Sequence, residues 1–182
     1  MTVRGVLQVH SAPPALSPHI EWAAAGIFGV PVKLHWIDQP AAPGSVRTEL
    51  AWQGRPGLSS EIASALATWK LLRFEVTEEA SPGCDAMRYS CTPALGMFAA
   101  TLSANGDIMI SENRLRAALT LAANSASTGA GLRELHGPRH PALGGSLDAE
   151  LALLLGDAWD AELEPFRHAS AGAPVRWLHA TG

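Results

Sequence analysis

The stretch VRGVLQVHSAPPALSPHIEWAAAGIFG, residues 3–29, contains the pattern of a strand, a proline-rich turn and a helix in succession. Apolar and polar residues alternate within residues 3–11, which is the period-two pattern of a strand with one buried face. Pro13 and Pro14 end that pattern. Ser17 and Pro18 then predict a helix start, because serine caps helix N-termini and proline is tolerated in the first turn. Gly29 and Pro31 end the helix.

The same alternation returns at residues 32–39, 46–53 and 72–79, and residues 58–69 have apolar side chains at helical spacing. The order strand, helix, strand, strand, helix, strand is that of the split βαβ, or ferredoxin-like, plan. We therefore expect residues 3–79 to form an antiparallel sheet with both helices on one face. The buried face of that sheet should contain Leu7, Leu34, Leu50 and Phe74.

The pattern of residues 81–182 predicts an extension of the half formed by residues 3–79. We therefore expect residues 1–182 to form a single extended α+β domain. MRYSC at 87–91 reads as a strand, and Asn105-Gly106 is typical of a hairpin turn. A helix is expected from about 113 to 123 with Leu115, Ala118, Leu119 and Ala122 inward, then a long loop over 124–146. Ser146 should open a last helix, with Leu147, Leu151, Leu154 and Ala158 inward and Pro165 as its limit. A strand at 175–179 closes the chain.

Composition limits the classes of function. The chain has 182 residues, 47% of them hydrophobic, and a net charge of −4. Proteins that coat nucleic acid or anionic membranes are usually basic, so we expect neither nucleic-acid binding nor membrane insertion. No apolar run is long enough to span a bilayer, and none resembles a signal peptide. The sequence thus predicts a cytoplasmic protein, in which Cys84 and Cys91 are free thiols.

Two groups of residues are candidates for function. The first surrounds the turn into the first helix, where His10, His19 and Trp22 are not needed to start the helix or to fill its apolar stripe. Trp22 in particular suits a contact with a partner or an anion near a helix N-terminus. The alternative is that the prolines are punctuation and the histidines lie on the surface.

The second group is the polar face of the predicted sheet, on which nine residues should project. They are Arg4, Gln8, His10, Lys33, His35, Arg47, Glu49, Arg73 and Glu75. This face could bind a polar ligand, or pair His10 or His35 with Glu49 or Glu75 for acid–base chemistry. It could equally be solvated, or covered by the C-terminal half through ion pairs.

Other chemistry has less support. His136 and His140 are four residues apart, but Pro138 prevents the helix that would align them on a metal. We therefore predict no metal site and no cofactor. The acidic residues of the last predicted helix are expected on a solvated outer face: Glu150, Asp157, Asp160 and Glu164.

Four segments resemble an uncharacterised actinobacterial family, a domain of unknown function: residues 3–32, LLRFEVTEEASPG (71–83), RYSCTPALGMF (88–98) and LEPFRHASAGAPVRWLH (163–179). The resemblance covers nearly the whole chain and implies no catalytic residues. It implies a connection with fatty-acid or lipid metabolism, because genes of that family tend to lie near fatty-acid synthesis genes.

The sequence therefore favours a non-catalytic binding or regulatory protein with a protein partner or small ligand. The residues expected to take part are His10, His19, Trp22, His35, Arg47 and Glu49. The alternative is a small enzyme that uses His10 or His35 with Glu49 or Glu75. Homo-oligomerisation stays open.

Overall fold

The computed structural model describes residues 2–136, 146–168 and 176–178, with side chains for residues 2–124 and 146–168. The chain divides into two compact units. Residues 1–108 and 159–182 form the first, and residues 109–158 form the second. Over the described ranges, no helix has the length and apolar character needed to cross a membrane.

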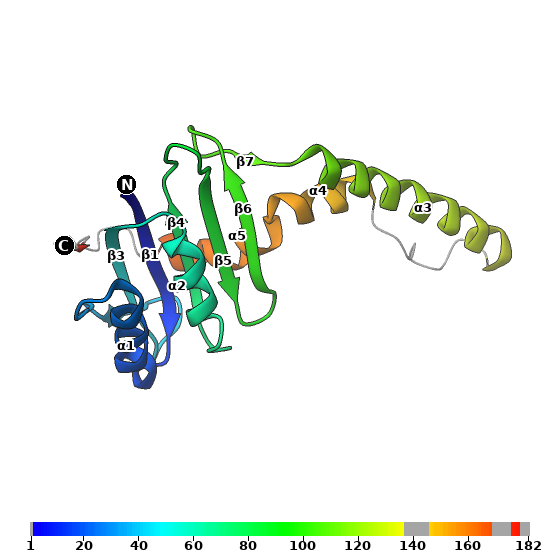
Figure 1. The fold of residues 1–182 in the computed structure, drawn as a ribbon. Coiled ribbons are helices and arrows are strands. Elements are labelled where there is room, and N and C mark those ends of the chain that lie inside the picture. The colour runs from blue at the N-terminus through cyan, green and yellow to red at the C-terminus, as the bar shows by residue number, and fades with distance from the viewer. Residues whose placement is uncertain (1, 137–145, 169–175, 179–182) are drawn as a thin grey trace. The chain divides into compact units, whose positions relative to one another are not determined.

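The first unit is built on one sheet (Figure 1), in which the described strands follow the order β2-β3-β1-β4-β5-β6-β7. Their bounds are β1 Val3–Ala12, β2 Ile37–Asp38, β3 Val46–Gly54, β4 Arg73–Glu78, β5 Ala86–Thr92, β6 Gly96–Leu102 and β7 Ile108–Met109. The central strand β1 pairs antiparallel with both β3 and β4. A last strand, β8 (Arg176–Leu178), pairs parallel with β3. With its helices, this sheet confirms the α+β class.

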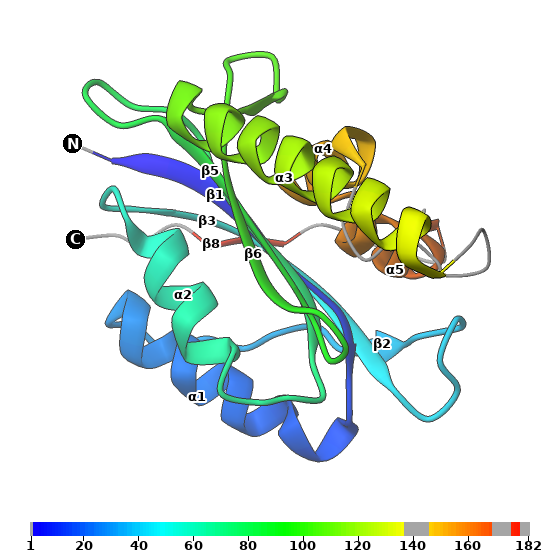
Figure 2. The same ribbon diagram turned by 90° about the vertical axis from the view of Figure 1, so that its right-hand side faces the viewer.

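Helices α1 (Ser17–Phe28) and α2 (Leu58–Leu66) cover one face of the sheet, and α5 (Asp157–His168) lies on the other (Figure 2). The main hydrophobic core lies under α1 and α2. It includes all four residues expected to share a buried face: Leu7, Leu34, Leu50 and Phe74. Helix α2 is held at its start by Glu78 of β4, whose carboxylate accepts the Gly57 and Ser59 N–H groups at 2.7 and 2.9 Å.

Gly5 of β1 is required by the same core. A methyl group at this position would lie 2.1 Å from a ring carbon of Trp52 and 2.2 Å from the Thr77 carbonyl oxygen. Both neighbours are fixed, one by complete burial and the other by the backbone of the adjacent strand. Trp52 can therefore approach β1 closely only because Gly5 has no side chain.

Two expectations about the N-terminal half are wrong. Ser17 does not cap α1, because a short 3-10 helix, η1 (Pro14–Leu16), runs directly into it and Leu16 takes the cap position. Residues 32–36 do not form a strand, although Val32 and Leu34 are buried as expected. Glu21 of α1 accepts hydrogen bonds from the Lys33 side chain, the Leu34 N–H and the Trp36 indole. These contacts tie the segment to α1, and only Ile37–Asp38 pair with β3.

The end of the chain also differs from the prediction. Helix α3 (Glu112–His136) continues past residue 124, consistent with the absence of proline before Pro138. The prediction therefore started the loop too early, at residue 124, where the chain is still helical. Residues 137–145 of the expected loop lie outside the described part. Ser146 does cap a helix, α4 (Leu147–Leu155), by accepting the Ala149 N–H. However, Gly156 ends α4 in the left-handed conformation, and α5 continues through Pro165.

In the second unit, α3 and α4 pack against each other. The predicted inward stripe of α3 is only partly buried. Ala118 is buried, whereas Leu115 and Leu119 are exposed.

Candidate functional site

The polar face of the sheet is organised around the carboxylate of Glu75, which projects from β4 and is buried. His10 Nε2, from the neighbouring strand β1, lies 2.7 Å from Glu75 Oε2. On the other side, Arg88 of β5 donates to Oε1 from Nε and Nη2 at 3.1 and 2.9 Å. Ser90 donates to the same oxygen at 3.2 Å. The antiparallel register explains this grouping, because Glu75 pairs with Ser90 across the two strands.

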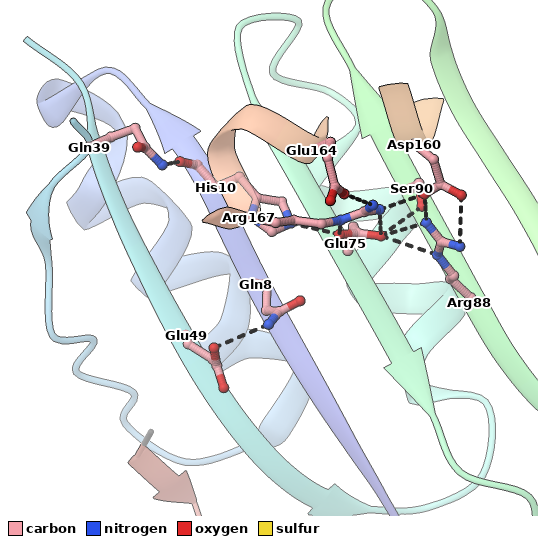
Figure 3. A network of polar contacts seen from close by, with 10 residues as sticks. All are labelled: Gln8, His10, Gln39, Glu49, Glu75, Arg88, Ser90, Asp160, Glu164 and Arg167. Carbon is pink, nitrogen blue, oxygen red and sulfur yellow. Dashed lines mark hydrogen bonds and ion pairs between the residues drawn. The ribbon is translucent and has the colours of Figure 1, made fainter. Parts of the chain in front are cut away.

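Helix α5 adds the remaining partners (Figure 3). Arg167 donates from Nε to Glu75 Oε2 at 2.8 Å and from Nη2 to Oε1 at 2.7 Å, a bidentate contact. Asp160, about two helical turns earlier, accepts from both Arg167 and Arg88. Two carboxylates and two guanidinium groups therefore alternate across the boundary between the sheet and α5.

The pKa values respond to this arrangement. Burial alone would raise the pKa of Glu75, but hydrogen bonds and charge from His10 and Arg167 hold it far below its ordinary value. Burial alone would also raise the pKa of Asp160. Hydrogen bonds and charge from Arg88 and Arg167 outweigh burial, so this pKa is lowered too. Both groups are therefore carboxylates at neutral pH.

Apolar contacts hold the same helix on the sheet. Leu163 is fully buried, and the Trp159 ring lies 5.1 Å from that of Phe98 on β6. The Trp159 indole also donates to the Gly96 carbonyl at 3.0 Å. At the other end, the Arg73 guanidinium lies over the Phe166 ring at 4.7 Å and pairs with Glu162 at 3.1 Å. The polar face is thus covered by the C-terminal helix, in part through ion pairs.

The six residues expected to bind a ligand or partner do not form one site. His10 and Glu49 lie on the polar face, where Glu49 accepts a hydrogen bond from Gln8 at 3.1 Å (Figure 3). Alternation along β3 places Arg47 on the same face as Glu49. His19 and Trp22 are exposed on α1, which covers the opposite face. His35 is exposed in the irregular segment before β2, so neither it nor Lys33 projects from a strand as expected.

The acidic residues of the last helix are not all solvated. Asp160 is half-buried and pairs with Arg88 and Arg167, which corrects the expectation for that residue. Glu164 also accepts from Arg167 but is exposed, as expected. Among the described residues, no three His, Cys, Asp or Glu side chains are grouped as a metal site would require. Cys84 is exposed, and burial raises the pKa of the buried Cys91 thiol.

Arg88, Ser90 and Arg167 were not among the residues singled out from the sequence. Alternation within MRYSC does place Arg88 and Ser90 on one face of a strand, which is the signal that could have found them. Arg167 is 92 residues from Glu75 along the chain, and no local pattern connects the two.

Comparison with known proteins identifies the family of the chain. No curated protein and no solved structure matches the chain significantly. A family model described as "Protein of unknown function (DUF3145)" matches residues 6–143 and 139–180. The chain therefore belongs to the DUF3145 family.

Proposed function

We propose that the protein is a non-catalytic binding protein of the cytoplasm that contacts a protein partner through the outer side of α1. The observation that carries this proposal is the position of Trp22, which is 79% exposed on a helix whose other face is buried in the core. A large aromatic side chain in water gains much from burial in a partner's pocket, and tryptophan is enriched among residues that dominate binding energy.

His19 gives this surface a polar neighbour. It is exposed and lies three residues before Trp22, so the two side chains are neighbours on one side of the helix. The first turn of a helix also carries partial positive charge. The chemistry that fits is an apolar pocket for the indole with a carboxylate beside it.

Helix α1 is held firmly in place, which favours recognition. Glu21 accepts from Lys33 Nζ at 2.8 Å and from the Leu34 N–H at 3.1 Å. Burial would raise the pKa of Glu21, but these donors and the Trp36 indole lower it. A surface that is ordered before binding loses less conformational entropy when a partner binds.

The acid–base alternative has less support. His10 is 4% exposed, and both oxygens of its partner Glu75 accept from arginine. A general base needs a pKa near the working pH and access to substrate, and the pKa of Glu75 is shifted the other way. Glu49 is engaged by Gln8, and His35 lies off the sheet. The family resemblance suggests fatty-acid or lipid metabolism as the setting for the partner.

The test is Trp22→Ala, with Leu71→Ala as the matched control because Leu71 is also apolar and 63% exposed but lies outside α1. Tagged proteins are expressed in the source cells, and captured proteins are quantified by mass spectrometry beside thermal melting. We expect wild type and Leu71→Ala to retain the same partner. Trp22→Ala should lose it at an unchanged Tm. Retention by Trp22→Ala, or a Tm lowered as by a core deletion, would make Trp22 a structural residue and refute the proposal.

A further inference from the structure

Arg47 is a buried cation with two side-chain nitrogens that make no hydrogen bond to the described residues. It lies on β3, and alternation along the strand places it on the polar face with Glu49. Only 8% of its surface is exposed. Its Nε and Nη1 atoms are buried and have no hydrogen-bond partner in the part of the chain that the structure describes.

The other buried charged side chains of this face, unlike Arg47, have partners of opposite charge. Glu75, Arg88 and Arg167 are saturated by one another and by Asp160. A buried guanidinium without a counter-charge carries a large desolvation cost, and each unmade hydrogen bond adds to it. The described residues compensate this cost for every member of the Glu75 network, but they supply no partner for Nε and Nη1 of Arg47. These two nitrogens are therefore open to a group of a ligand.

The nearest acidic residue on the same strand does not pair with Arg47. Glu49 stands two residues along β3 on the same face, but its carboxylate accepts from Gln8 Nε2 at 3.1 Å. Among the described residues, no ion pair joins Arg47 to Glu49. Asp38 pairs with Val46 and therefore projects from the opposite face of the sheet. Glu49 nevertheless adds a negative charge to the face on which Arg47 lies.

We propose that Arg47 is the anchor of a binding site for a small monocarboxylate. The planar fork of a guanidinium matches the two oxygens of a carboxylate in a bidentate contact. One cation balances one negative charge, and a phosphate dianion would meet repulsion from Glu49, which lies on the same face of β3. Ile37, paired with Arg47 across the strands, offers an apolar neighbour for the hydrocarbon part of the ligand.

The experiment measures Tm at pH 7 in sodium acetate, in sodium chloride at equal ionic strength, and in inorganic phosphate. Wild type should melt about 3–6 °C higher in acetate than in chloride once acetate exceeds its Kd about tenfold. Arg47→Met should show no such rise, and its Tm in chloride should equal or exceed that of wild type because an unpaired buried charge is gone. Arg55→Met, which removes an exposed arginine, should respond to acetate like wild type.

A second measurement does not depend on the methionine variant. In arginine Nε–Hε NMR spectra of wild type, acetate should shift one signal strongly, and Arg47→Lys should remove that signal. Three results would overturn the proposal. The first is an equal Tm of wild type in acetate and in chloride, and the second is a larger rise of Tm in phosphate than in acetate. The third is that Arg47→Met and Glu49→Gln each lower Tm while the double variant melts no lower than either single variant. The last would mean that Glu49 pairs with Arg47 in solution.

Discussion

Glu75→Gln is expected to lower the free energy of unfolding by about 3–5 kcal/mol, the usual cost of removing one partner from a buried ion pair. The amide keeps the shape of the side chain but removes the negative charge that Arg88 and Arg167 share. The acids that remain for the two guanidinium groups, Asp160 and Glu164, are both more exposed than Glu75. Urea denaturation followed by circular dichroism measures the loss.

Glu79→Gln is the matched control, because Glu79 also pairs with an arginine, Arg4, but both side chains are more than half exposed. Its effect should stay within about 0.5 kcal/mol, as for most exposed ion pairs. Equal losses for the two variants would show that Glu75 contributes no more than a surface charge.

The same carboxylate makes stability depend on pH. Because the pKa of Glu75 in the folded protein lies below its ordinary value of 4.5, its contribution is fully present above about pH 4.5. It is lost progressively as pH falls from there toward the lowered pKa. Asp160 titrates in the same sense. The gap in stability between wild type and Glu75→Gln should therefore narrow as pH falls from 5 to 2.

Phe74→Ala is expected to cost about 3–5 kcal/mol, because it leaves a cavity among fixed neighbours on the opposite side of the same strand. Phe74 is fully buried in the core and sits between β1 and β5, paired with Val9 and Cys91. Chemical denaturation measures the change, and Phe74→Leu provides a milder variant if the alanine protein does not fold.

Leu71→Ala again serves as the control, since Leu71 lies just before the same strand and is exposed. It should change stability by less than about 0.5 kcal/mol. If Phe74→Ala lowered the free energy of unfolding by less than about 1 kcal/mol, β4 would not be a main contributor to the hydrophobic core.

Much of the sheet could be predicted because alternation of apolar residues reports which strand face is buried. That signal placed Leu7, Leu50 and Phe74 in one core, and glycine after asparagine marked the β6–β7 turn, where Gly106 has a positive φ. It failed at residues 32–36. There the apolar side chains are buried, but the hydrogen bonds go to Glu21 of α1 rather than to a strand. The finer comparison with the ferredoxin-like plan therefore stays a prediction.

The candidate site was harder to foresee. Alternation identified His10 and Glu75 as members of one polar face, and it left open whether that face was solvated or covered. The answer depends on Arg167 and Asp160, which reach Glu75 and Arg88 from a helix far along the chain. Contacts between distant segments leave no periodic pattern in the sequence. Arg47 was expected on this face, but its lack of partners follows only from the positions of its neighbours.

The account rests on the claim that α5 is held on the polar face by the contact between Glu75 and Arg167. A double-mutant cycle with Glu75→Gln and Arg167→Met measures that contact directly, with free energies of unfolding taken at pH 7. We predict a coupling energy of about 1–3 kcal/mol, because the two side chains share two hydrogen bonds in a buried network. Effects that add to within about 0.3 kcal/mol would contradict the claim. They would mean that α5 is held by its other contacts, such as those of Leu163 and Trp159, and that the pair of Glu75 and Arg167 does not close the polar face.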